Sequence, residues 1–330
     1  MKKLTDKKIL LVFITGALIF LLILIVLTSL STNKKKTIVG EPILSPTTVI
    51  PTQTIKIKEE VDYDLITSKI FNHIDTQKNN SFFYLSNNQK DLSYQANSYL
   101  ASAYFALFQK KKDSQYISQT INLADSLKNH CQEKKDFQKD CYFVLEPYFA
   151  LYNYNKHPRY LEFIQQNFTQ LENYTPKSLP AYVHLSKQYL SYYLINFENS
   201  YYQKALATYQ KALDLLPDNQ SNIGLLLQNQ QLFYQVTNDN SWLKTSDNFF
   251  SQFDTSLYQK MNATQKLFVL SALKNLSSYE SLYNRLLSEF VDSHLNKDKK
   301  FVCAQANDCG ENGLSLIIDN ALFINLLNHE

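Results

Sequence analysis

The feature that most constrains the fold of this chain is a succession of helical patterns that begins near residue 61. Apolar and aromatic side chains recur there at spacings of three and four residues, and the breaks carry Asn, Asp, Pro or Ser. This spacing is typical of amphipathic helices joined by short connections. It predicts twelve helices, at residues 61–75, 91–108, 114–129, 141–154, 157–172, 181–197, 200–216, 222–237, 241–253, 263–275, 277–293 and 317–328.

The predicted helices alternate in character along the chain. Every second one is apolar or rich in small residues nearly all round, as in YLASAYFALF at 99–108, whereas SQYISQTINLADSLKNH at 114–130 has one apolar stripe and one polar face. A helix that is apolar all round must be covered on both sides. The even-numbered helices are therefore expected to form an inner layer and the odd-numbered ones an outer layer, in six hairpins with each outer helix followed by its inner one.

Two segments carry a likeness to a known architecture. Residues 76–127 and 299–327 each place a short extended piece before an apolar helix. In this layout residues 61–330 resemble the six-hairpin or (α/α)6 toroid shared by many glycosidases, polysaccharide lyases and sugar epimerases. The resemblance implies an all-α toroid domain that binds or processes a polysaccharide of the cell envelope or the environment.

A second resemblance supports an alternative. ALATYQKALDLLP at 205–217 is similar to the second helix of a tetratricopeptide repeat, through Ala205, Tyr209, Ala212 and Pro217. The preceding helix lacks the Leu and Gly of that repeat, and no other segment repeats the pattern at a period of 34 residues. The alternative is an open helical scaffold for protein–protein interaction at the membrane, in which the first and last helices lie far apart.

The first sixty residues predict a membrane anchor. Residues 9–30 form an uncharged stretch of 22 residues, which is long enough to cross a hydrocarbon core of about 30 Å. Four lysines precede it and three follow it. The positive-inside bias narrowly favours a cytoplasmic tail at 1–8. Residues 31–60 are rich in Thr, Pro and Lys and predict an extended linker, so we expect the domain at 61–330 to lie outside the cytoplasm.

The cysteines agree with that location. Cys131 and Cys141 are separated by nine residues, and Cys303 and Cys309 by five. Each pair can form a local disulfide in an oxidising compartment. The alternative is a set of four separate buried thiols. The spacing does not suit a zinc site, and we expect no metal.

Charge and motifs exclude several further classes of function. The net charge is +3 without a basic cluster, which gives no support to nucleic-acid binding. Neither Gly-rich phosphate loop, GxGxxG or GxxxxGK[ST], occurs, and we expect no cofactor. Any catalysis would rest on carboxylates.

A candidate site begins with two polar residues inside an apolar run. Asp319 and Asn320 interrupt the segment LSLIIDNALFINLL, and a buried carboxylate needs partners. In one interpretation, the predicted helix begins near Asp319 and the carboxylate caps it. In the other, the starts of inner helices surround the mouth of the toroid. Asp319 and Asn320 then line a cleft with Asp91, Tyr94 and Gln95.

Other polar residues on the predicted inner helices complete the candidate site. Glu146 lies in FVLEPYFAL, and an apolar setting would raise its pKa as a general acid requires. Paired with Asp91 or Asp319, it would supply the two carboxylates of glycoside hydrolysis. The alternative is a core glutamate bonded to a Tyr or Lys. The other cavity-facing candidates are His184, Gln228, Asn229, Gln230 and Gln231.

The sequence leaves open whether the protein is an enzyme, and the balance is against it. One Trp and five Gly leave little for the aromatic platforms and long loops of toroid enzymes. If it is an enzyme, the resemblance implies a glycoside hydrolase, a lyase or a sugar epimerase. The expected partners are the membrane, and either a polysaccharide or proteins.

Overall fold

Each of the twelve predicted helices has a counterpart in the computed structural model. The structure describes residues 62–79, 82–83, 93–134, 141–171, 174–296, 298–306, 309 and 314–328. The predicted tail, membrane segment and linker lie outside these residues. Within them, no helix has both the length and the apolar character needed to cross a membrane.

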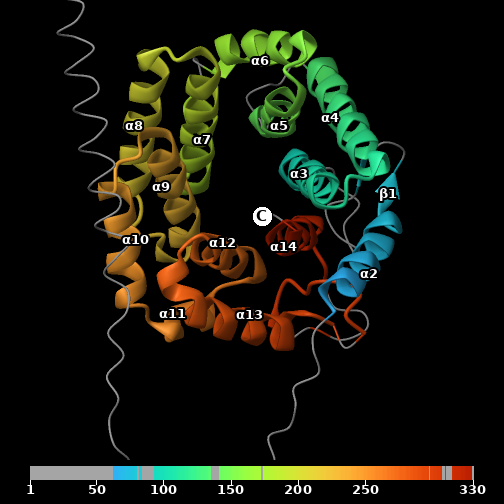
Figure 1. The fold of residues 1–330 in the computed structure, drawn as a ribbon, viewed down its shortest axis with the longest axis vertical. Coiled ribbons are helices and arrows are strands. Elements are labelled where there is room, and N and C mark those ends of the chain that lie inside the picture. Colours follow the sequence, from blue (N-terminus) through green and yellow to red (C-terminus); the bar gives the residue numbers. More distant parts are fainter. Residues whose placement is uncertain are drawn as a thin grey trace, which may run out of the picture. The chain divides into compact units, whose positions relative to one another are not determined.

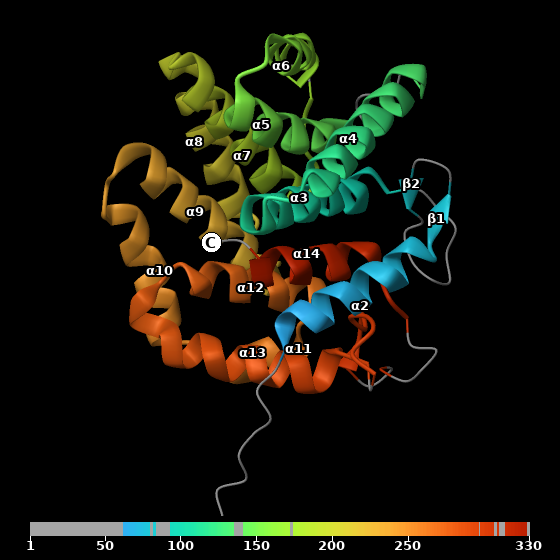
Figure 2. The same ribbon diagram turned by 45° about the vertical axis from the view of Figure 1, so that its right-hand side comes forward.

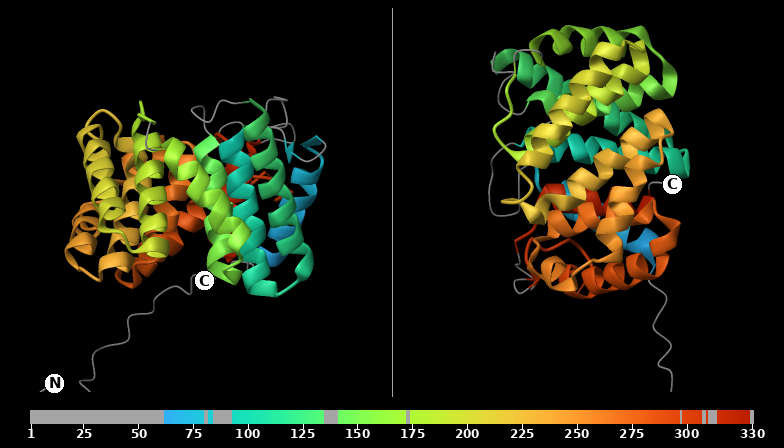
Figure 3. Two further views of the ribbon diagram at one scale, coloured as in Figure 1. Left: turned by 90° about the horizontal axis from the view of Figure 1, so that it is seen from above. Right: turned by 90° about the vertical axis from the view of Figure 1, so that its left-hand side faces the viewer.

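The helices form two layers around a centre (Figure 1). The inner helices are α3 (Tyr94–Lys111), α5 (Leu145–Asn155), α7 (Leu179–Asn196), α9 (Ile223–Thr237), α12 (Ala263–Lys274) and α14 (Ile317–Asn328). The outer helices are α2 (Tyr63–Asp75), α4 (Ser114–Lys134), α6 (Pro158–Leu171), α8 (Asn199–Asp214), α10 (Ser241–Ser251) and α13 (Glu280–His294). Figure 3 shows several of these helices side-on, running up and down. The predicted alternation of inner and outer helices is therefore confirmed.

A few short elements were not predicted. The helix α11 (Thr255–Lys260) precedes α12, and three short 3-10 helices occur at Cys141–Val144, Gln220–Asn222 and Ser277–Tyr279. The strands β1 (Lys78–Asn79) and β2 (Phe82–Phe83) pair antiparallel before α3, in the segment where the sequence predicted a short extended piece. α11 begins where Asp254 accepts a hydrogen bond from the Ser256 amide at 2.8 Å, and this capping explains how so short a helix starts.

The predicted pairing within hairpins is reversed in the structure. Each inner helix pairs tightly with the outer helix that follows it, as in α3 with α4 and α7 with α8. These turns are short, since α3 ends at 111 and α4 begins at 114. Four of them open with a left-handed residue with φ between 55° and 57°, at Lys112, Lys156, Phe197 and Asn238. The connections from outer to inner helices are the longer ones, because α2 ends at 75 and α3 begins only at 94.

The ring closes between helices that are far apart in the sequence. α14 packs against α3, α12 and α2, and Figure 2 shows α14 and α2 side by side. The Asn328 amide lies 3.5 Å from the Thr67 hydroxyl, and Lys110 donates to Asn328 Oδ1 at 3.3 Å. α14 and α2 thus make the sixth hairpin from the last and first described helices. This closure excludes the open solenoid of the tetratricopeptide alternative.

Aromatic side chains hold the outer layer to the inner one. Phe233 of α9 stacks on Trp242 of α10, with ring centroids 4.4 Å apart. Phe168 of α6 stacks on Tyr192 of α7 at 4.0 Å. Such pairs add about 0.5 to 1.5 kcal/mol to the burial of the rings themselves. The abundance of Tyr and Phe in the sequence therefore serves the contact between layers.

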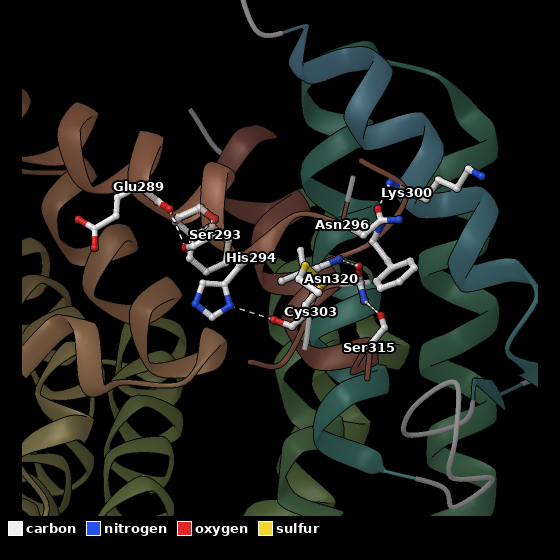
Figure 4. Close-up of a disulfide and its surroundings, with 12 residues drawn as sticks. Glu289, Ser293, His294, Asn296, Lys300, Cys303, Ser315 and Asn320 are labelled. Carbon is white, nitrogen blue, oxygen red and sulfur yellow. Dashed lines mark hydrogen bonds between the residues drawn. A yellow bond between two sulfur atoms is a disulfide. The ribbon is translucent and has the colours of Figure 1, made fainter. Parts of the chain in front are cut away.

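The structure contains two disulfides, each closing a local loop. Cys131 at the end of α4 is joined to Cys141, and Cys303 to Cys309, with Cα–Cα distances of 5.9 Å and 5.3 Å. The second lies in the connection between α13 and α14 (Figure 4). There the His294 ring nitrogen Nδ1 lies 3.0 Å from the Cys303 carbonyl oxygen. This fixes the loop against the end of α13.

The inner helices α9 and α12 approach so closely that a glycine is required between them. A Cβ atom at Gly224 of α9 would lie 2.5 Å from the Val269 amide nitrogen and 2.7 Å from the Phe268 carbonyl carbon, both of α12. These are main-chain atoms of a packed helix, so they cannot move aside alone. Gly224 therefore fixes the spacing of this part of the inner ring.

We predict that Gly224→Ala lowers the free energy of unfolding by about 1 to 3 kcal/mol, the usual cost of overpacking a core. Alanine is the better helix former, so a stabilised variant would contradict the close contact. Gln203→Ala on the exposed face of α8 is the control, with an expected change within about 0.5 kcal/mol. Chemical denaturation followed by circular dichroism measures both.

Candidate functional site

All six inner helices contribute side chains to one cavity at the centre of the ring. The cavity has a volume of about 260 Å³. Its lining includes six side-chain amides: Gln228, Asn229, Gln231, Gln235, Asn275 and Asn325. An apolar scaffold thus surrounds a small polar centre, as is common in binding sites for small molecules.

The one ion pair of the described cavity lining joins Glu146 of α5 to Lys187 of α7. The Glu146 side chain is 12% exposed and that of Lys187 41% exposed. Burial opposes ionisation of Glu146, but the positive charge of Lys187, the nearby His184 and the hydrogen bond from Lys187 outweigh it and lower the pKa of the carboxyl. Glu146 is therefore negatively charged at neutral pH.

A histidine and a tyrosine lie beside this pair. His184 of α7 is buried, and its Nε2 lies 3.3 Å from the hydroxyl oxygen of Tyr99 of α3. Its ring also meets the Phe143 ring edge-on, with centroids 4.7 Å apart. Burial lowers the pKa of His184 to about 4, although the Glu146 charge acts in the opposite direction. The ring is therefore neutral at neutral pH.

Several polar atoms of the cavity have no hydrogen-bond partner within the described protein. They are Glu146 Oε2, both amide atoms of Asn229, and Asn325 Oδ1. Asn229 is only 3% exposed. A buried polar group without a partner costs about 1 to 3 kcal/mol. These atoms are therefore the ones that a bound molecule can satisfy.

Two other amides of the same lining have protein partners. Gln228 Nε2 donates to the Phe268 carbonyl at 3.1 Å. Gln231 Nε2 donates to the Ala272 carbonyl at 2.6 Å, and its Oε1 accepts from Asn275 at 3.1 Å. Gln228 and Gln231 thus tie α9 to α12 and hold the cavity wall in place. Gln230, on the same helix, is directed away from the cavity, to Tyr209 and Ser246.

The structure brings together five of the predicted site residues: Glu146, His184, Gln228, Asn229 and Gln231. The pKa rise that an apolar setting would give Glu146 is wrong, because Lys187 lies next to the carboxylate and lowers its pKa. The alternative prediction, a glutamate bonded to a Tyr or Lys, is confirmed. Lys187 was not singled out from the sequence, although it lies one helical turn from His184. Tyr99 and Asn325 were also missed, since nothing local to their segments distinguishes them from packed polar residues.

Asp319 and Asn320 lie elsewhere. Neither lines the central cavity. Helix α14 begins at Ile317, so Asp319 lies in its first turn rather than at the cap, and it accepts a hydrogen bond from the Thr264 hydroxyl. Asn320 accepts from the Val302 amide at 2.8 Å and donates to the Ser315 hydroxyl at 2.7 Å (Figure 4). Asn320 is a buried structural residue, and the predicted place of Asp319 at the rim of the central cavity is wrong.

The remaining predicted residues do not join the central cavity either. Tyr94 and Gln95, in the first turn of α3, are absent from its lining. The Tyr94 ring packs near the His130 ring of α4, with centroids 5.7 Å apart. Asp91 lies outside the described residues. Across the part of the chain that the structure describes, no group of three or more His, Cys, Asp or Glu side chains is arranged to hold a metal ion.

Comparison with known proteins agrees with the fold. No protein-family model matches the chain, and no curated protein sequence matches it. Among solved structures it is similar to the GH76A α-1,6-mannanase from Salegentibacter sp. HEL1_6, with a TM-score of 0.64 and 11% identity over 80% of this chain and 96% of that chain. It is also similar to the Lin0763 protein from Listeria innocua, with a TM-score of 0.62 and 11% identity over 81% of this chain and 96% of that one.

A third similar structure is an unsaturated glucuronyl hydrolase from Streptococcus agalactiae, with a TM-score of 0.55 and 12% identity over 80% of this chain and 89% of that chain. The mannanases and this hydrolase are glycosidase-like (α/α)6 toroids. The described part of residues 62–328 therefore has the predicted toroid fold, and identities this low show the fold alone.

One of the mannanase structures also contains a sugar. It is an inactive variant, with two adjacent aspartates replaced, in complex with α-1,6-mannotriose. The present chain has no two consecutive aspartates at any position.

Asp319 makes the stability of the domain depend on pH. Burial raises the pKa of this carboxyl from 3.8 to about 7, against the lowering effect of the Thr264 hydrogen bond. The folded protein holds the proton more tightly than the unfolded chain. The stabilisation from this group is therefore complete below pH 4 and is lost as the pH rises through 7.

We predict that Asp319→Asn stabilises the protein above pH 7, by up to about 4 kcal/mol, since each unit of pKa shift corresponds to about 1.4 kcal/mol. Below pH 4 the two proteins should differ by no more than about 1 kcal/mol. Denaturation curves from pH 4 to 8 measure the difference, with the exposed Asp218→Asn as the control. Parallel pH profiles for the wild type and Asp319→Asn would contradict the assignment.

Proposed function

We propose that this protein is a membrane-anchored carbohydrate-binding toroid, which holds a sugar residue in its central cavity outside the cytoplasm. The observation that supports this most directly is the set of unpartnered polar atoms at Glu146, Asn229 and Asn325. They lie on three different inner helices and face one small cavity. A sugar offers several hydroxyl groups, each of which both donates and accepts hydrogen bonds.

The lining favours binding over hydrolysis. Glycoside hydrolysis generally uses two carboxyl groups about 5 to 9.5 Å apart. Glu146 is the single carboxylate among the described residues of the central cavity. It is paired with Lys187 and has a lowered pKa, which does not suit a general acid. We therefore assign Glu146 a role in ligand binding rather than in proton transfer.

The choice of ligand class also draws on the structural neighbours. An inactive variant of a mannanase of this fold is known in complex with α-1,6-mannotriose, and a hydrolase of the same fold is named for a glucuronyl substrate. Both ligands are carbohydrates. At 11 to 12% identity these neighbours suggest the chemistry to test first, and the polar cavity of this chain gives the reason to test it.

The anchor and the location complete the proposal. Residues 9–30 are long and apolar enough to span a bilayer, and the linker at 31–60 would separate the toroid from the membrane. Two local disulfides are typical of proteins exported to an oxidising compartment. The toroid would thus meet glycans at or beyond the outer face of the membrane.

The binding test uses the full-length protein in detergent micelles and isothermal titration calorimetry with α-1,6-mannotriose and other neutral trisaccharides. We predict that Asn229→Leu weakens binding of the preferred sugar about tenfold or more, because it removes a donor and an acceptor from a buried site. The same change replaces an unpartnered buried amide by an apolar group, so stability should be unchanged or higher.

Weaker binding together with unchanged or higher stability in Asn229→Leu indicates a binding role for Asn229 rather than a structural one. Asn248→Leu, on the exposed face of the outer helix α10, is the matched control and should leave affinity unchanged. If no glycan binds the wild-type protein, or if Asn229→Leu binds as well as the wild type, the central cavity is not a sugar site.

The topology is tested with two reporters fused in turn after Glu330. We predict activity from a reporter that works only outside the cytoplasm, and none from a reporter that works only inside it, because the segment 9–30 would leave the domain outside. Removal of residues 1–30 should release the protein from the membrane fraction. The reverse pattern of reporter activity would overturn the proposed location.

A further inference from the structure

Aromatic rings from several elements meet at one side of the central cavity. The Tyr99 ring of α3 has its centroid 6.0 Å from that of His184 of α7 and 6.1 Å from that of Phe268 of α12. Phe143, just before α5, packs against His184 with centroids 4.7 Å apart. These are packing distances for rings, and all four side chains are buried. Because α3, α7 and α12 hold alternate places in the inner ring (Figure 1), the four side chains close the cavity across its centre and form its floor.

Three of these floor residues lie at the same level of the ring. α3 begins at 94, α7 at 179 and α12 at 263, so Tyr99, His184 and Phe268 each lie five residues after the start of their helix. The inner helices run in the same direction, since an outer helix returns the chain between each two. At a rise of about 1.5 Å per residue, the floor lies about 7.5 Å from the helix starts.

The exposed residues of the cavity lining lie at the other level, where two inner helices end. They are Gln235 near the end of α9, and Lys274 and Asn275 at the end of α12. Lys274 comes six residues after Phe268, so the rim lies about 9 Å from the floor along the helix axis. The cavity is therefore a blind pocket, entered from the end of the ring where the short turns to the outer helices begin.

We propose that this pocket binds the end residue of a sugar chain, end-on, and does not bind residues in the interior of a chain. The proposal rests on the carbohydrate-binding function above and narrows its ligand class to chain ends and short oligosaccharides. An interior residue has a sugar neighbour on each side and needs a groove that is open in two directions. A pocket with a floor of buried rings and a volume of about 260 Å³ admits a chain in one direction only.

The unpartnered atoms of the lining agree with this mode of binding. Asn229 Oδ1 and Nδ2 and Asn325 Oδ1 belong to the wall of the pocket. Asn229 comes one residue after Gln228 and six before Gln235 on α9, so it lies deep in the pocket, about 9 Å from the rim. A sugar residue must therefore enter fully to reach Asn229, and the depth suits one or two residues of a chain.

The experiment is a length series titrated into the full-length wild-type protein in detergent micelles by isothermal titration calorimetry. The probes are linear α-1,6-linked mannose chains, from the monosaccharide to the hexasaccharide and a long linear polymer. If the binding test above identifies another neutral sugar, its chains take their place. We expect the affinity to rise up to the disaccharide and to stay within about twofold for all longer chains. Each chain, whatever its length, should bind one protein molecule.

Two results would overturn end-on binding. One is an affinity that keeps rising through the hexasaccharide, and the other is a number of bound protein molecules that grows with the length of the polymer. The proposed function would still stand in either case if Asn229→Leu weakens binding. Failure of every glycan to bind would instead remove the proposed function itself.

Ser271→Phe tests the path into the pocket. Ser271 of α12 lies in the wall midway between Phe268 and Lys274, so a phenylalanine there should fill the pocket and weaken binding of every chain length about tenfold or more. Ser118→Phe, on the exposed face of α4, is the matched control and should bind like the wild type. Wild-type affinity in a folded Ser271→Phe protein would contradict entry into the pocket. Since the wild-type length series decides the mode of binding, an unfolded variant leaves the test intact.

Discussion

The architecture depends on the contact of α14 with α2 and α3. Five hairpins follow one another along the chain, but the sixth is made by the last and first described helices. Asn328 lies between Thr67 and Lys110 at this junction. Without that contact the inner helices would expose apolar faces, and the central cavity would lose one wall.

Buried polar atoms in the cavity lower the stability that the surrounding ring of helices provides. The inner helices bury many apolar side chains, yet Asn229 and Glu146 retain buried polar atoms without partners. Groups of this kind destabilise a fold unless something else satisfies them. Gln231 donates to the Ala272 carbonyl and accepts from Asn275, which shows that the scaffold can satisfy an amide in the same lining. This contrast between Gln231 and Asn229 is the reason to propose Asn229 as a ligand-binding residue.

The two helical layers of this fold could be predicted from the sequence, whereas the candidate site could be predicted only in part. Helix positions follow from apolar spacing, which is local information. The sequence placed Glu146 and His184 at the centre because polar residues stand out on apolar helices. It did not reveal Lys187, which lies 41 residues from Glu146 and reverses the expected pKa shift. Asp319 was also conspicuous as a charge in an apolar segment. It does not line the cavity, and is buried where the first turns of α12 and α14 meet.

The closure of the ring also has a consequence for how the protein folds. α14 comes after all the other described helices in the chain, whereas its partners α2 and α3 come first. Contacts between segments so distant in sequence form late and slow folding. During synthesis, the first hairpins therefore keep an apolar face uncovered until α14 has been made. The domain is most exposed to aggregation and to proteases in this interval, so a chaperone has most to protect just before the ring is complete.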